Sequence, residues 1–153
     1  MATDPLRGRD TASSRTVTVL GSAGLVLLLA AVYLYGSREG KLAEMTAVEA
    51  RLALGAEAGD PVTEVVKDRS SEVYYHVVLS GVPLGWPLQL RCEWRRPGGQ
   101  VARRNNYETR LIHKSVWPTH CRQAFGPDAP SGEWQVRLLS GDRVLSTSSF
   151  VMR

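Results

Sequence analysis

Residues 17–35, VTVLGSAGLVLLLAAVYLY, form a run without a charged side chain in a chain of 153 residues. An α-helix of this length extends about 28 Å, which is close to the thickness of the hydrocarbon core of a bilayer. Tyr33 and Tyr35 lie at one end of the run, where amphipathic aromatic rings favour the membrane–water interface. The sequence therefore predicts one transmembrane helix over residues 17–36.

A cleaved signal peptide is the alternative, with an apolar region of about 7–15 residues that ends in small residues. Here the run is longer and AAVYLYGSREG places bulky residues near its end, which favours an uncleaved anchor. Arg7, Arg9 and Arg15 precede the run, whereas Arg38 and Lys41 follow it closely. This narrow excess of positive charge on the first side predicts a cytoplasmic N-terminus and an exported C-terminal part.

The segments on either side of the apolar run differ in composition. Residues 1–16 are polar without an apolar period and are predicted to be a disordered cytoplasmic tail. Residues 37–60 are rich in helix-forming Ala, Glu, Leu and Arg. Leu42, Met45, Val48 and Leu52 recur there at steps of three and four, which predicts a juxtamembrane helical stalk. Dimerisation through this stalk is left open because the run is too short for a coiled-coil assignment.

From residue 61 onward, apolar and polar residues alternate with a period of two, which is typical of half-buried strands. Turn-forming residues such as PGG at 97–99 and SGD at 140–142 separate the runs. About seven short strands of this kind predict an all-β sandwich over residues 61–153. The residues expected to face inward are Val73, Tyr75, Val77, Leu79, Leu88, Leu90, Cys92, Trp94, Trp134, Val136 and Leu138.

Cys92 and Cys121 are the two cysteines of the chain. Cys92 shares the inward face with Leu90 and Trp94, so a disulfide with Cys121 would lie in the core and close a loop of about 30 residues. Such a bond requires an oxidising compartment, which agrees with an exported domain. A metal site or a reactive thiol is disfavoured because familiar ligand spacings are absent and Cys92 is expected to be buried.

The expected domain, residues 61–153, carries thirteen Lys and Arg against eight Asp and Glu. Two arginine pairs, Arg95-Arg96 and Arg103-Arg104, flank the same turn, so this tip is the candidate patch for an anionic partner. Trp86, in the Gly- and Pro-rich GVPLGWPL, is a candidate exposed aromatic contact. Nucleic acid is not expected as a partner outside the cytoplasm.

No serine–histidine–carboxylate, phosphate-loop or paired-carboxylate motif is present in the sequence, so no catalytic residue, metal or cofactor is assigned. The expectation is that the protein is not an enzyme.

The ending SGEWQVRLLSGDRVLSTSSFVM resembles the end of uncharacterised bacterial envelope domains of immunoglobulin-like type, which often follow a single membrane anchor. The matching positions are Gly132, Trp134, Val136, Gly141 and Phe150, and the resemblance extends over residues 73–152. It implies an immunoglobulin-like sandwich behind an anchor in the bacterial inner membrane, with the domain in the periplasm. The expected function is binding or scaffolding for a protein partner in the envelope. The alternatives are a membrane-tethered assembly factor that handles a metal or thiol for a respiratory complex, and an accessory subunit of a large membrane complex.

Overall fold

The computed structural model describes the backbone of residues 13–57, 59–67 and 71–153, and the side chains of these residues except 13–23, 38 and 39. The chain divides into two compact units, Met1–Gly40 and Lys41–Arg153. The first twelve residues of the predicted cytoplasmic tail lie outside the described part. The remaining residues of that segment, 13–16, belong to a helix.

Helix α1 extends from Ser13 to Glu44 and contains the segment predicted to cross a membrane. The apolar side chains described there, from Leu25 to Tyr35, are exposed. Among the residues whose side chains are described, no helix combines the length and apolarity that crossing a membrane requires. The transmembrane helix therefore stays a prediction.

The prediction of a helical stalk over residues 37–60 is wrong beyond Glu44, where the helix ends. Strand β1, Thr46–Ala53, pairs antiparallel with β3, Ser71–Ser80, instead of continuing the helix. A register shift between Ala47 and Glu49 breaks the strict alternation that would have indicated a strand. Pairing with β3 outweighs the weak helical preference of this segment. The second unit consequently begins at Lys41 and not at residue 61.

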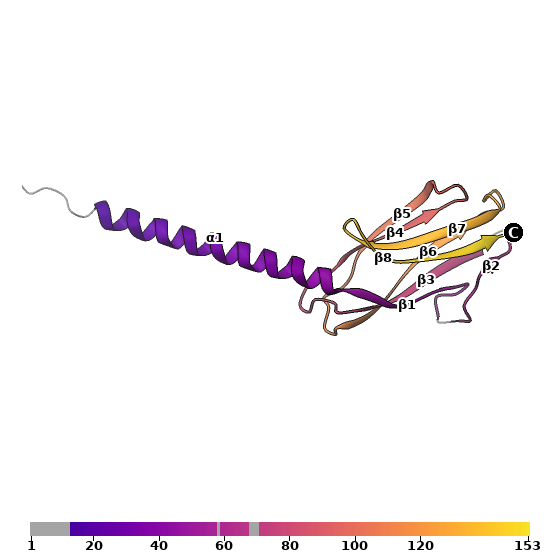
Figure 1. The fold of residues 1–153 in the computed structure, drawn as a ribbon, viewed down its shortest axis with the longest axis horizontal. Coiled ribbons are helices and arrows are strands. Elements are labelled where there is room, and N and C mark those ends of the chain that lie inside the picture. Colours follow the sequence, from indigo (N-terminus) through magenta and orange to yellow (C-terminus); the bar gives the residue numbers. More distant parts are fainter. Residues whose placement is uncertain (1–12, 58, 68–70) are drawn as a thin grey trace, which may run out of the picture. The chain divides into compact units, whose positions relative to one another are not determined.

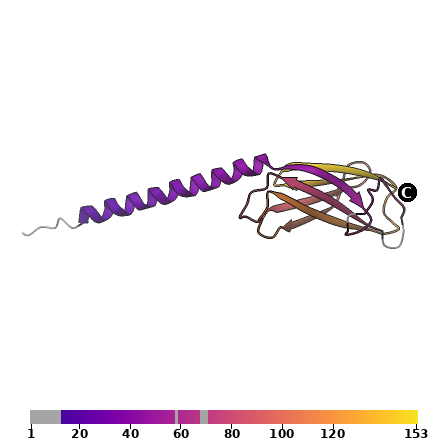
Figure 2. The same ribbon diagram turned by 90° about the horizontal axis from the view of Figure 1, so that it is seen from below.

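Two sheets form the second unit. The first has the order β1-β3-β6, where β6 is Val116–Phe125. The second has the order β2-β8-β7-β4-β5, and its strands are β2 (Glu64–Val65), β4 (Gln89–Arg95), β5 (Val101–Glu108), β7 (Gly132–Ser140) and β8 (Arg143–Met152). All pairs are antiparallel except β2 with β8. The sheets are the two layers of a sandwich (Figure 1), and the view from below looks onto the three-stranded sheet (Figure 2).

The core lies between these layers and contains the residues that the alternation predicts to face inward. Every one of the eleven inward positions predicted from β3, β4 and β7 is buried. Phe125, at the end of β6, lies at the centre of the aromatic packing. Its ring contacts Trp134 edge-on at 4.8 Å, Phe150 at 5.6 Å and Trp94 at 5.9 Å between centroids. Edge-to-face contacts of this kind add to the stabilisation from burial.

The predicted disulfide is confirmed, and it joins the two sheets. Cys92 on β4 and Cys121 on β6 are bonded, with their Cα atoms 6.5 Å apart. Two hydrogen bonds from β5 reach β6 on the same side of the sandwich: Tyr107 Oη lies 2.7 Å from Thr119 Oγ1, and Asn105 Nδ2 donates to the Arg122 carbonyl at 3.2 Å. The covalent bond is thus part of a set of contacts that closes this side.

Removal of the disulfide is expected to destabilise the domain strongly. The double variant Cys92→Ala/Cys121→Ala should lose about 3–4 kcal/mol of unfolding free energy, because the bond closes a loop of about 30 residues. Urea unfolding of the full chain in mild detergent, followed by tryptophan fluorescence, measures this loss. The wild type with a reductant is the matched control and should show the same lower midpoint. An unchanged midpoint in both samples would contradict a stabilising role.

Candidate anion-binding surface

The arginines that the sequence singles out lie in the turn between β4 and β5 and in these two strands. Arg96 N donates to the Gln100 carbonyl at 3.0 Å and Gly99 N donates to the Arg96 carbonyl at 2.9 Å, which closes the turn. Gly98 and Gly99 have φ angles of 89° and 84°, a region that glycine adopts without a steric cost. The PGG sequence therefore forms the predicted hairpin turn.

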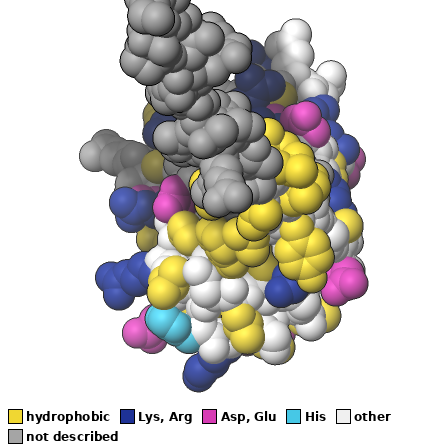
Figure 3. Space-filling view, turned by 90° about the vertical axis from the view of Figure 1, so that its left-hand side faces the viewer, with side chains coloured by type: hydrophobic (Ala, Val, Ile, Leu, Met, Phe, Trp, Pro, Cys, Tyr) yellow, Lys and Arg dark blue, Asp and Glu magenta, His cyan; other side chains and the backbone are white. Residues whose placement is uncertain are grey.

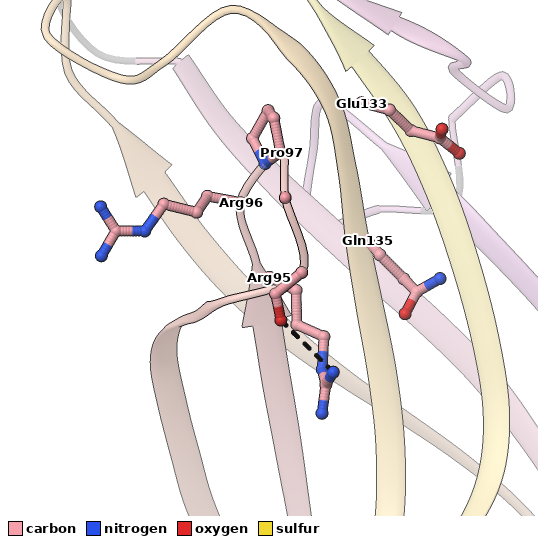
Figure 4. Close-up of a pocket in the computed structure, with 7 residues that line it drawn as sticks. Arg95, Arg96, Pro97, Glu133 and Gln135 are labelled. Carbon is pink, nitrogen blue, oxygen red and sulfur yellow. Dashed lines mark hydrogen bonds between the residues drawn. The ribbon is translucent and has the colours of Figure 1, made fainter.

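The structure brings together only two of the four predicted arginines. Arg95 and Arg104 both contact Glu93 on the outer face of the five-stranded sheet. Arg103 is opposite the buried Trp94 in the β4–β5 register, so its side chain leaves the strand on the other face. Arg96 extends from the turn in a different direction from Arg95 (Figure 4). A single patch made of all four side chains is therefore not formed.

Glu93 is the centre of the cluster that the structure does form. Its side chain is only 6% exposed. Arg104 Nε donates to Glu93 Oε1 at 3.1 Å, and Arg95 Nη2 donates to Oε2 at 3.4 Å. Arg91 Nε lies 3.5 Å from Oε1, and Arg137 is the direct cross-strand neighbour of Glu93 on β7. We call these five residues the arginine cluster: Arg91, Glu93, Arg95, Arg104 and Arg137.

The charges of the cluster are unbalanced, because Arg91, Arg95 and Arg104 contact the single Glu93 carboxylate. Among the described residues, the one further carboxylate beside them is Asp142, 3.7 Å from Arg91. Burial by itself would raise the pKa of Glu93, and this is the largest single effect on it. Hydrogen bonds from Arg104 and Arg95 and the charges of Arg104 and Arg91 together outweigh burial, so the pKa of Glu93 is held below its usual 4.5. The carboxylate is ionised at neutral pH and leaves the cluster with an excess of positive charge.

Next to the cluster, the hairpin tip borders a cavity of about 280 Å³ (Figure 4). Its lining residues are Arg95, Arg96, Pro97, Gly98, Gly99, Glu133 and Gln135. Gly132 has a φ of 120°, and a Cβ there would lie 3.0 Å from the Pro97 side chain. Glycine at this position lets the turn pack closely against β7. Glu133 is also one of the lining residues, so the lining has charges of both signs, and the surface suited to anions is the arginine cluster and not the cavity itself.

The arrangement suits binding of an extended acidic ligand. Guanidinium groups donate several hydrogen bonds in a planar geometry that matches carboxylate and phosphate oxygens. Among the residues described, no group of three or more His, Cys, Asp or Glu side chains is placed to hold a metal ion.

Sequence reasoning missed three members of the cluster: Arg91, Glu93 and Arg137. The signal was present, because the alternation in LQLRCEW and EWQVRLL places these three residues on the outer faces of their strands. What it lacked was the pairing of β4 with β7 and β5, which makes them neighbours. Trp86 is 46% exposed, and its role as an aromatic contact stays a prediction.

No known protein-family model matches the chain, and no curated protein matches it in sequence. Among solved structures, the chain is similar to an immunoglobulin-like protein from Pseudomonas aeruginosa, with a TM-score of 0.51 and 19% identity over 72% of this chain and 97% of that one. A glycosyl hydrolase family 2 member from Bacteroides cellulosilyticus has a TM-score of 0.43 and 18% identity, over 57% of this chain and 13% of that one. The CARDB domain of a Pyrococcus furiosus protein has a TM-score of 0.41 and 11% identity, over 71% of this chain and 90% of that one.

The likeness to the Pseudomonas protein shows the fold alone, and it confirms the predicted immunoglobulin-like β-sandwich. The other two structures are too remote to carry an argument. Resemblance to envelope domains in particular stays a prediction.

Glu93→Gln is expected to destabilise the folded domain by about 1–3 kcal/mol at pH 7, because it removes a buried carboxylate that accepts hydrogen bonds from charged groups. A carboxyl group whose pKa is lower in the folded than in the unfolded state stabilises the folded domain at pH values above the usual carboxyl pKa. This stabilisation is lost as the pH falls through the pKa of the folded state. The difference between wild type and variant, measured by urea unfolding, should therefore narrow as the pH falls below the usual carboxyl pKa of 4.5.

Glu72→Gln is the matched control, because Glu72 is a half-exposed carboxylate 3.7 Å from Arg122 on the other sheet. We expect less than about 0.5 kcal/mol from that change. Equal effects of the two substitutions at pH 7 would contradict the central position of Glu93.

Proposed function

We propose that the chain is a single-pass envelope protein of a bacterial inner membrane, anchored by residues 17–35, whose periplasmic sandwich binds an acidic protein partner. The uncharged run of bilayer length supports the anchor. The excess of Arg before it supports a cytoplasmic N-terminus.

The disulfide supports the proposed side of the membrane. Both cysteines of the chain are in the Cys92–Cys121 bond, which persists in oxidising compartments and is rare in the cytosol. The bacterial periplasm is such a compartment. The excess of Arg before the apolar run and the bonded state of the cysteines are independent observations. Both support a periplasmic position for the sandwich.

The observation that carries the binding role is the arginine cluster. Glu93 fixes the guanidinium groups of Arg95 and Arg104 by hydrogen bonds, so these groups are held in place before a partner arrives. Arg137 adds a further positive charge from β7, and the arginines of the cluster outnumber its carboxylate, which favours carboxylate-rich segments. A charged face of this kind is sufficient for a binding or scaffolding function.

An accessory subunit of a larger membrane complex would use the same surface and is the remaining alternative. A factor that handles thiols is disfavoured because the disulfide leaves no free thiol.

Topology is tested by fusing alkaline phosphatase, which is active only in an oxidising compartment, after Arg153. We expect enzyme activity from the fusion in intact bacteria, and none from the same fusion lacking residues 17–35. A cytosolic fluorescent reporter at the same position should give the opposite pattern. Activity of the cytosolic reporter on the complete chain would contradict the proposed placement.

Binding is tested with a fluorescein-labelled decaglutamate peptide and the full chain in neutral detergent, by anisotropy. Arg104→Ser/Arg137→Ser should weaken binding about fivefold to thirtyfold, which corresponds to about 1–2 kcal/mol for two charge-assisted contacts. The affinity of the wild type should also fall with added salt.

The matched control is Arg51→Ser/Arg122→Ser, which removes the same charge from strands of the three-stranded sheet. This control should retain affinity within about twofold. If both double variants lose affinity equally, net charge and not the arginine cluster is responsible for binding.

A further inference from the structure

Two loops at one end of the sandwich are bound to each other through their backbones. Residues 81–88 connect β3 to β4, and residues 109–115 connect β5 to β6. Gly85 N donates to the Ile112 carbonyl at 2.9 Å, Ile112 N donates to the Trp86 carbonyl at 3.3 Å, and Val82 N donates to the Ser115 carbonyl at 3.1 Å. Val82 and Ile112 are buried beneath them. The two loops, with Val116 at the start of β6, form one fixed surface that we call the loop end.

Large apolar side chains are exposed at the loop end. Leu84 is 55% exposed, Trp86 46%, Leu111 48% and Val116 50%. The space-filling view from the left-hand side of Figure 1 shows exposed hydrophobic side chains with Lys and Arg side chains among them (Figure 3). A contiguous exposed apolar patch on a small domain marks an interaction site.

The charges within the two loops are of one sign. Residues 81–88 contain no charged residue, and residues 109–115 contain Arg110 and Lys114 without an acidic residue. Both basic side chains are exposed. Aliphatic residues and Trp flanked by Arg and Lys are the composition of protein surfaces that insert at an anionic membrane interface. Glu44, Glu108 and Asp142 also lie toward this end of the sandwich, but outside the two loops.

The chain enters the sandwich at this same end. A Cβ on Gly81 would lie 3.0 Å from the Glu44 carbonyl oxygen and 3.6 Å from Met45 Cα, and Met45 is fully buried. The apolar run ends at Tyr35, and nine residues separate it from Met45. This connector extends about 15 Å as a helix and at most about 35 Å when fully extended. The headgroup region on each side of a bilayer is about 5–7 Å thick, so a chain anchored by residues 17–35 keeps the loop end within reach of it.

We propose that the loop end docks on the surface of the anionic bilayer that anchors the same chain. Leu84, Trp86 and Leu111 enter the headgroup region, while Arg110 and Lys114 contact lipid phosphates. This inference rests on the proposed anchor, but it adds a second contact with the membrane that the anchor alone does not require.

The test uses the full chain in vesicles of about 70% phosphatidylcholine and 30% phosphatidylglycerol, with and without bromine on the upper acyl chain. Bromine quenches tryptophan only on contact. Trp94 and Trp134 are buried in the core and Trp117 in β6 is partly buried, whereas Trp86 is exposed, so Trp86 is the expected main source of quenching. We expect lower emission in brominated vesicles, and at least a halving of this decrease in Trp86→Phe and in Leu84→Ser/Leu111→Ser.

The matched control is Leu54→Ser/Val66→Ser. Leu54 follows the last residue of β1 and is 56% exposed, and Val66 follows β2 and is 71% exposed, so both lie at the end of the sandwich away from Met45. This variant should be quenched as strongly as the wild type. Equal emission with and without bromine, or equal quenching in Trp86→Phe and wild type, would overturn the docking.

Flotation of the same samples after alkaline extraction separates the two proposals. Protein that floats with the vesicles but shows no quenching of Trp86 retains the anchor and refutes only the docking. Protein that does not float refutes the anchor, and the docking with it.

Discussion

The covalent bond between Cys92 and Cys121 connects the two sheets, and the arrangement of β4 depends on it. A strand exposes every second side chain on each face, so fixing Cys92 in the core also fixes which neighbours face out. Trp94 then packs on Phe125 within the core, while Glu93 emerges on the opposite face. A slip of one residue would bury arginines and expose the tryptophan. The bond therefore stabilises the core and, through β4, the geometry of the arginine cluster.

Glu93 shows how a carboxylate whose burial is energetically unfavourable is retained on that outer face. A buried carboxylate without partners would shift to its neutral form, and here the surrounding guanidinium groups keep it charged. In return, the carboxylate reduces repulsion between arginines that lie on adjacent strands. The side chains of Arg91 and Arg95 are about one-third exposed and that of Arg104 more so, so part of each remains accessible to a ligand.

The alternation of apolar and polar residues was sufficient to predict the strands that bury one face. It thereby predicted the sandwich and the disulfide too. It failed at β1, where the bulge after Ala47 and the distant partner β3 decide the structure. It also misjudged the basic patch, because neighbours along the chain, such as Arg103 and Arg104, leave a strand on opposite faces. Arg137 joined the cluster only through pairing with a strand about forty residues earlier, and single-sequence periodicity carries no information about which strands pair.

The two proposed contact surfaces are compatible because they lie at different places along β4. This strand starts at Gln89, next to the loop end, and finishes at Arg95 by the hairpin turn, so its length is about 20 Å. The Debye length at physiological ionic strength is about 8 Å, which is shorter than that separation. In the proposed arrangement, anionic lipids therefore attract Arg110 and Lys114 but do not neutralise Arg95 at the other end of β4. Docking of the loop end would fix the direction of the strands relative to the membrane and present the arginine cluster to an acidic partner.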